Sequence, residues 1–214
     1  MFNRACGLSL LALAGVFLAG CFTTQTYPIL QERGISLQPG DLETHGISFI
    51  TPSAATGQEE EKQAVAFVFA DVMQKKRNAI HVIPLAETLS AINKAGLADR
   101  YSQMYRHYRD TGLLDRDVLR QIGNVTKAGY VVQIKLQSFE QSEKERLGIF
   151  GLRIVETKAA GVRLFFQIWD SRDGTVAWEA TQELHIAYDS ITENQLTLNS
   201  VVTRAAEELV SKLP

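Results

Sequence analysis

One segment in the second half of the chain, residues 161–189, constrains the fold more than any other. Its sequence, GVRLFFQIWDSRDGTVAWEATQELHIAYD, holds two strand-like runs joined by Ser-Arg-Asp-Gly. Asp-Gly tolerates the positive φ angles of a tight turn, so the two runs are predicted to pair as an antiparallel hairpin. Apolar residues lie on both faces of the first run, which is therefore predicted to be a central strand. One face holds Val162, Leu164, Phe166 and Ile168, and the other holds Phe165 and Trp169.

The rest of the chain alternates between strand-like and helix-like patterns. Apolar runs that end at prolines predict short strands, and the alternation of Val132, Ile134 and Leu136 predicts a longer strand with one buried face. The resulting fold class is α+β, with a mostly antiparallel, mixed sheet backed by helices. The predicted strands are 46–52 and 79–84, and the predicted helical segments are 62–76, 85–127 and 197–213.

Three helical segments show apolar stripes that predict their buried faces. In the first helix the predicted stripe is Ala64, Phe67, Val68 and Val72, and in the last it is Val202, Ala205 and Leu209. In the middle segment the stripe is Tyr101, Met104, Tyr105 and Tyr108, flanked by arginines. An aromatic and basic nucleic-acid surface is the alternative, but core packing with solvated arginines is favoured, and no nucleic-acid partner is expected. Asp115 is a predicted cap for the helix that follows.

The amino-terminal segment indicates export and lipidation. The apolar run of 16 residues, 5–20, follows Arg4 and is shorter than the roughly 20 residues that a membrane-spanning helix needs. It ends in Leu-Ala-Gly before Cys21, which matches the bacterial lipobox. Residues 1–20 are therefore predicted to be a lipoprotein signal peptide, with acyl chains such as palmitate on Cys21. A small buried helix ending in cysteine is the alternative.

The predicted processing defines the remaining organisation. Phe22 in place of an aspartate favours the outer membrane, so we expect a domain on its periplasmic face, lipid-anchored at Cys21. Residues 21–45 are predicted to be a tether with little regular structure, although its Tyr-Pro-Ile-Leu stretch could dock on the domain, and 46–214 a single domain. The cysteines of the chain are Cys6 and Cys21, so the folded part has no thiol for a disulfide, a metal site or catalysis.

Three stretches of the second half carry a family resemblance. DRDVLRQIGNVTKAGYVVQIKLQSF, VRLFFQIWDSRDGTVAWEA and AAEELVSKLP resemble periplasmic lipoprotein domains related to the TolB amino-terminal domain. That group includes the curli-secretion channel lipoprotein and the outer-membrane activator of penicillin-binding proteins. The matching features are the turn at 127–130 and the positions of Asp170, Gly174 and Trp178. The resemblance implies a TolB amino-terminal-like sandwich over residues 46–213, and its structural motifs imply little about function.

One segment departs from the curli channel, whose subunits extend long membrane-inserting hairpins. The corresponding segment here, 140–161, has an apolar middle of only six residues, 147–152, whereas spanning strands need about 9 to 11 residues each. A pore is therefore not expected. The same middle is instead a candidate partner loop, and the alternative is that it folds back on the core as an extra strand. Its candidate residues are Leu147, Ile149, Phe150 and Leu152.

Catalytic motifs are missing from the sequence. The histidines, His45, His81, His107 and His185, are scattered, and no nucleophile elbow or phosphate loop is present. Asp170 and Asp173 flank the hairpin turn, where aspartate is expected for backbone reasons. We expect no enzyme, cofactor or metal, but an accessory or assembly factor of the cell envelope that binds a protein partner. A self-assembling subunit of an export complex is the alternative, and an envelope hydrolase is a weaker third.

Overall fold

The computed structural model describes residues 24–54, 59–149, 152–190 and 196–214. Its seven-stranded sheet has the order β1-β7-β6-β5-β2-β4, and β3 pairs with β5 beside this path. The strands are β1 (Gln25–Gly34), β2 (Ile47–Phe49), β3 (Ser53–Ala54), β4 (Val82–Ile83), β5 (Tyr130–Ile149), β6 (Leu152–Asp170) and β7 (Val176–Ser190). The helices of the described residues are α2 (Asp41–His45), α3 (Glu59–Lys76), α4 (Leu85–Lys94), α5 (Ala98–Thr111), α6 (Arg116–Thr126) and α7 (Leu198–Val210).

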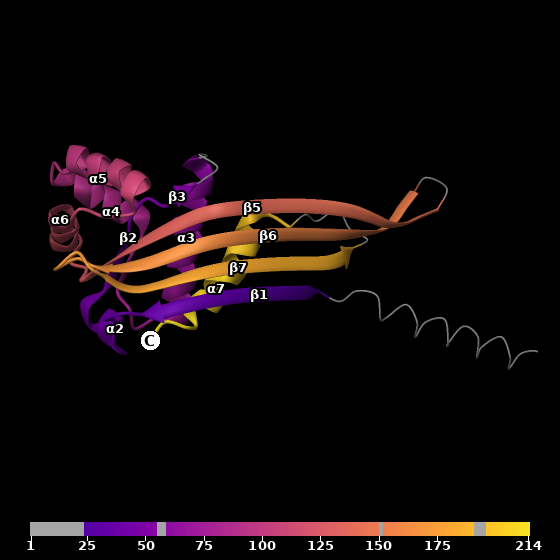
Figure 1. The fold of residues 1–214 in the computed structure, drawn as a ribbon, viewed down its shortest axis with the longest axis horizontal. Coiled ribbons are helices and arrows are strands. Elements are labelled where there is room, and N and C mark those ends of the chain that lie inside the picture. The colour runs from indigo at the N-terminus through magenta and orange to yellow at the C-terminus, as the bar shows by residue number, and fades with distance from the viewer. Residues whose placement is uncertain (1–23, 55–58, 150–151, 191–195) are drawn as a thin grey trace, which may run out of the picture.

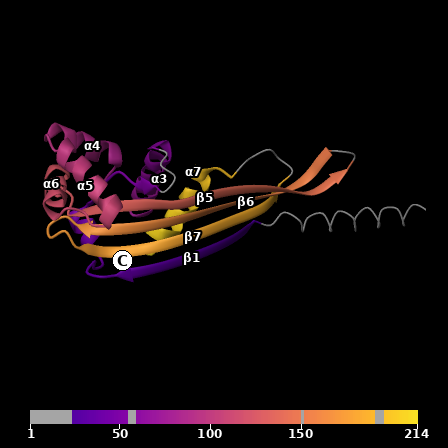
Figure 2. The ribbon, with the colours of Figure 1, turned by 45° about the horizontal axis from the view of Figure 1, so that its top comes forward.

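The sheet is mixed, and helices cover parts of both faces. β1, β7, β6 and β5 pair antiparallel with one another in that order, whereas β2 and β3 pair parallel with β5, and β4 pairs parallel with β2. Helices α3 and α7 pack on one face, and α4, α5 and α6 cover the other face near one end (Figures 1 and 2). The predicted α+β architecture is confirmed, and so is the central position of β6.

Two hydrophobic clusters lie on either side of the sheet. In the larger, Phe166 of β6 packs between Phe69 of α3 and Trp178 of β7, with ring centroids 5.4 and 6.0 Å away. In the smaller, Tyr101, Met104 and Tyr108 of α5 are buried in the cluster that includes Trp169. The predicted stripe of α5 is confirmed for these three residues, whereas Tyr105, its fourth member, is only half-buried.

The predicted turn between β6 and β7 is present and well bonded. Gly174 has φ of 76°, in the left-handed region that favours glycine. Asp170 accepts hydrogen bonds from the backbone N–H of Arg172 (2.8 Å) and from its Nε (2.9 Å). Asp173 accepts from the backbone and hydroxyl of Thr175. Both carboxylates therefore stabilise the turn.

Asp170→Asn is expected to destabilise the protein by about 1–2 kcal/mol near neutral pH, because bonds to a charged group are lost. Burial raises the pKa of Asp170, but hydrogen bonds from the side chain and backbone of Arg172 outweigh it and hold the pKa below its usual 3.8. The stabilisation of the folded protein by ionised Asp170 is therefore present above the pKa that this residue has in the unfolded chain. It is lost as pH falls through the lower pKa of the folded state. Urea titrations from pH 6 to pH 2 should show the two proteins converging at the acid end. A constant difference across this range would contradict this linkage.

The predicted stripe of α3 is partly wrong. Phe67 is 72% exposed, whereas Val65, Phe69 and Met73 are fully buried. The helix contacts α7 as well as the sheet, so its buried face is broad. The stretch AVAFVFADVM is apolar at almost every position, and such a run does not fix the phase of the helix.

The predicted lack of regular structure in the tether is also wrong for residues 25–34 and 41–45, which form β1 and α2. All ten residues of β1 pair with β7, so the Tyr-Pro-Ile-Leu stretch does dock on the domain. The N–H of Ile35 donates to the carbonyl of Ala177 (3.0 Å), which continues the β1–β7 register. In an antiparallel strand the backbone N–H and C=O groups of successive residues point to opposite sides of the strand. The backbone groups of the odd-numbered residues of β1 therefore point toward β7. Pro28 therefore lies at an outward position, where its missing N–H breaks no bond in the sheet.

Candidate partner-binding surface

The segment predicted as a partner loop is the end of a long hairpin. β5 and β6 continue through it as paired strands, and Ile149 pairs with Leu152. The β6–β7 ladder stops at Glu156 and Ser190, so the hairpin extends beyond β7 (Figure 1). Within the described residues, 147–149 and 152 thus belong to the paired strands of this hairpin. Leu147, Ile149 and Leu152 lie at the ends of these strands, and Phe150 lies outside the described residues.

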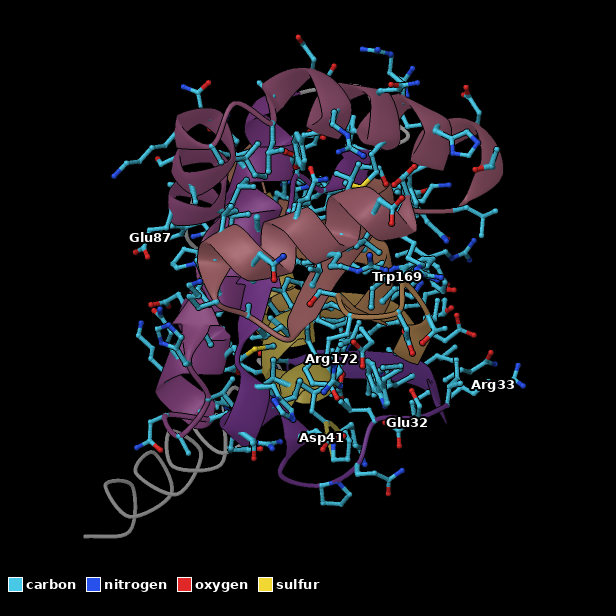
Figure 3. The ribbon with its side chains drawn as sticks, turned by 90° about the vertical axis from the view of Figure 1, so that its left-hand side faces the viewer. Glu32, Arg33, Asp41, Glu87, Trp169 and Arg172 are labelled. Carbon is cyan, nitrogen blue, oxygen red and sulfur yellow. The ribbon has the colours of Figure 1, made fainter. Side chains whose placement is uncertain are left out.

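The second feature of this surface is the outer edge of β1. β1 is the terminal strand of the sheet, so the C=O groups of its even-numbered residues, and the N–H groups of all of these except Pro28, find no strand partner in the described part of the chain. Glu32 and Arg33 mark this edge in Figure 3. Tyr27 and Ile29 are 60% and 56% exposed. An exposed edge next to apolar side chains is a site where another strand can add.

The third feature is the face of strands β6 and β7 that lies opposite α3 and α7, next to β1. Arg163 of β6 donates to Glu183 of β7 from Nε (3.1 Å) and from its terminal nitrogen (2.7 Å). The Nε2 of His185 lies 2.9 Å from the other oxygen of Glu183. Hydrogen bonds from His185 and then Arg163 hold the pKa of Glu183 below its usual range.

A shallow depression of about 330 Å³ lies beside this cluster, and a glycine shapes it. A side chain at Gly161 would have its Cβ 2.8 Å from the Nδ1 of His185, so any larger residue there would require the exposed histidine ring to move. Tyr27 and Glu140 also line the depression. The arrangement suits contact with a polar and aromatic surface, because the charges are paired and the ring edges remain exposed.

The other predicted site residues do not come together. Cys21 lies outside the described residues. His45 packs near the ring of Tyr130, with centroids 6.2 Å apart, and His185 belongs to the cluster above. Among the described residues, no group of three or more His, Cys, Asp or Glu side chains could hold a metal ion. The described helices include none that is long and apolar enough to cross a membrane.

A second polar cluster, at the opposite end of the sheet, serves the fold. The guanidinium of Arg172 lies 5.6 Å from the ring centroid of Tyr130, and the Tyr130 hydroxyl donates to Asp41 (3.2 Å). Figure 3 shows Arg172 and Asp41 near each other at this end. Burial is the largest cause that raises the pKa of Tyr130. The cluster joins α2 to the β6–β7 turn.

Sequence reasoning missed the residues of the edge and the open face. Tyr27 and Ile29 were assigned to a tether, and His185 was one of several scattered histidines. The sequence around Pro28 shows no regular alternation that could have identified β1, because Ile29 and Leu30 are both apolar and residues 31–33 are all polar.

No protein-family model matches this chain, and neither does any curated protein sequence. Solved structures do resemble it. The PelC dodecamer from Paraburkholderia phytofirmans is 14% identical with a TM-score of 0.49, covering 87% of this chain and 97% of that one. Lipoprotein GNA1162 from Neisseria meningitidis is 14% identical with a TM-score of 0.44, covering 78% and 99%. The LpoB C-terminal domain from Salmonella enterica is 12% identical with a TM-score of 0.32, covering 65% and 82%. These values assign neither a family nor a function to this chain.

Proposed function

We propose that this chain is an outer-membrane lipoprotein, anchored at Cys21, whose periplasmic domain binds a protein partner of the cell envelope without catalysis. The observation that carries the proposal is the outer edge of the ten-residue strand β1, which has no strand neighbour within the described residues and carries the exposed Tyr27 and Ile29. The lipobox before Cys21 supports the anchor. The turn bonds of Asp170 and Asp173 support a structural role for the carboxylates most open to a catalytic interpretation.

The mechanism is strand addition at a fixed place. An extended segment of the partner pairs with the outward backbone groups of β1, while Tyr27 and Ile29 supply apolar contact on the open face. The lipid holds this edge close to the membrane, because only three residues lie between Cys21 and Gln25. The lipid anchor keeps the domain at the membrane where the partner lies, and the outer edge of β1 makes the contact with that partner.

The test is photo-cross-linking in cells from Ile29, with Leu113 as the matched control. Leu113 is 60% exposed in the connection between α5 and α6, far from β1. We expect Ile29 to capture an outer-membrane or periplasmic protein that Leu113 does not capture. Glu32→Pro should abolish this cross-link, because it removes an outward N–H without touching the β1–β7 bonds. Equal capture from both positions, or capture that survives Glu32→Pro, would overturn the strand-addition mechanism.

Self-assembly is the second candidate, and the polarity of the strands favours it. Beyond its pairing with β2 and β3, β5 has no outer strand neighbour within the described residues, so the sheet has a second open edge. Successive antiparallel pairings make β1 run opposite to β5. Copies related by rotation can therefore place β1 of one beside β5 of the next as an antiparallel pair. In the same experiment, cross-links from Ile29 to another copy of this chain would select this candidate.

A further inference from the structure

The register of the sheet places the amino-terminal end of β1 and the end of the long hairpin on the same side of the molecule. Gln25 pairs with Ala187, which pairs with Ala159, which pairs with Ser142. The first residue of β1 therefore lies level with Ser142 of β5, and residues 143–149 of β5 extend beyond that level. Figure 1 shows the hairpin continuing past the start of β1.

Chain lengths fix how far each segment can reach beyond this level. From Ser142 to Ile149 the strand advances seven residues, or about 23 Å. From Gln25 back to Cys21 there are four residues, which span about 14 Å at most. The hairpin end therefore lies about 10 Å farther out than Cys21 can reach along the strand direction.

We infer that the end of this hairpin, residues 147–149 and 152–155, dips into the same membrane leaflet that holds the acyl chains of Cys21. The inference rests on the proposed lipid anchor and adds a second membrane contact made by the protein itself. If the acylated Cys21 lies at the boundary between headgroups and acyl chains, the hairpin end reaches the depth at which interfacial apolar segments bind, about 5–10 Å.

The sequence of the hairpin end fits this depth. Apolar residues dominate it, and charged residues lie on its membrane-distal side. The apolar residues are Leu147, Ile149, Leu152, Ile154 and Val155, and the charged residues are Glu143, Lys144, Glu145, Arg146 and Glu156. Arg153 is the one charged residue in the end, and a long cationic side chain there suits an anionic headgroup layer.

The same physics limits the contact to one leaflet. The hydrocarbon core is about 30 Å thick, so a reach of about 10 Å beyond the anchor does not cross it. Within the described residues, the backbone groups on the outer edges of the two-stranded ribbon also have no strand partner, and such groups are costly in hydrocarbon. The structure therefore favours a shallow contact that orients the sheet relative to the membrane.

A single-cysteine experiment on the full chain tests this contact. Cys6 leaves with the signal peptide and Cys21 is acylated, so Ile149→Cys would carry the only free thiol. Leu113→Cys, on the exposed connection at the opposite end, is the matched control. Each processed protein is labelled with an environment-sensitive fluorophore and reconstituted in phosphatidylethanolamine and phosphatidylglycerol vesicles that contain acyl-chain quenchers.

We expect the quenchers to reduce the emission at position 149 about twofold or more and to leave position 113 unchanged. Vesicle-bound protein whose label at 149 is as accessible to aqueous iodide as the label at 113 would overturn the inference. Failure of the lipid anchor gives a different result, because the protein would then lack acyl mass and would not float with the vesicles. Failure of partner binding affects only cross-links from Ile29. The three claims are therefore separable.

Discussion

Phe69→Ala is expected to lower the free energy of unfolding by about 3–5 kcal/mol, the usual range for removing a buried aromatic ring. Phe69 of α3 is fully buried, and its ring centroid lies 5.4 Å from that of Phe166 in the centre of β6. Truncation would leave a cavity between the helix layer and the sheet, and surrounding side chains can fill it only partly. Urea denaturation at neutral pH, analysed with the slope common to both proteins, measures the loss.

Phe67→Ala is the matched control, since it makes the same chemical change two residues away on the same helix. Phe67 is 72% exposed, so its truncation should change the free energy of unfolding by less than about 0.5 kcal/mol. Similar losses for the two variants would show that Phe67 is covered in solution. The assignment of the buried face of α3 would then be wrong.

This pair also shows what the sequence determines in an α+β chain. Strand alternation in residues 161–189 predicted the faces of β6 correctly, because a period of two allows only two assignments and the polar residues choose between them. In α3 almost every residue of the stretch is apolar, so several stripes are compatible with it. The choice depends on α7, which packs against α3 from far along the sequence.

The candidate surface was harder to predict for a related reason. An edge strand has one neighbour and a largely solvated environment, so β1 retains the polar composition of a tether. Only its partner β7 reveals it as a strand. In the hairpin, residues 147–152 are predicted from the sequence as a candidate partner loop, whereas continuation of the ladder through the charged residues before them depends on cross-strand pairing. Local pattern does not contain that information.

Gly123→Ala is expected to destabilise the protein by about 2–4 kcal/mol, although helix propensity alone predicts the opposite sign. Gly123 lies inside α6 without a positive φ, where alanine would ordinarily add about 0.5–1 kcal/mol. In this fold the new Cβ would lie 2.8 Å from the Cβ of Ser171 and 2.9 Å from the carbonyl oxygen of Ala128. The hydroxyl of Ser171 donates to that carbonyl and to the carbonyl of Gly129, at 3.1 and 2.9 Å, so relieving the clash also disturbs these bonds.

Two comparisons identify the clash as the cause. Gly34→Ala places a Cβ 3.9 Å from its nearest neighbour, an ordinary contact, and should change stability by less than about 0.5 kcal/mol. In a Ser171→Gly background, which removes the Cβ and the hydroxyl that obstruct the site, Gly123→Ala should cost clearly less than in the original chain. Urea denaturation of all the single variants and the double variant measures this coupling. Additive effects would mean that helix α6 does not pack on the β6–β7 turn as closely as the structure places it, and that the close approach of Gly123 to Ser171 is not what requires glycine at this position.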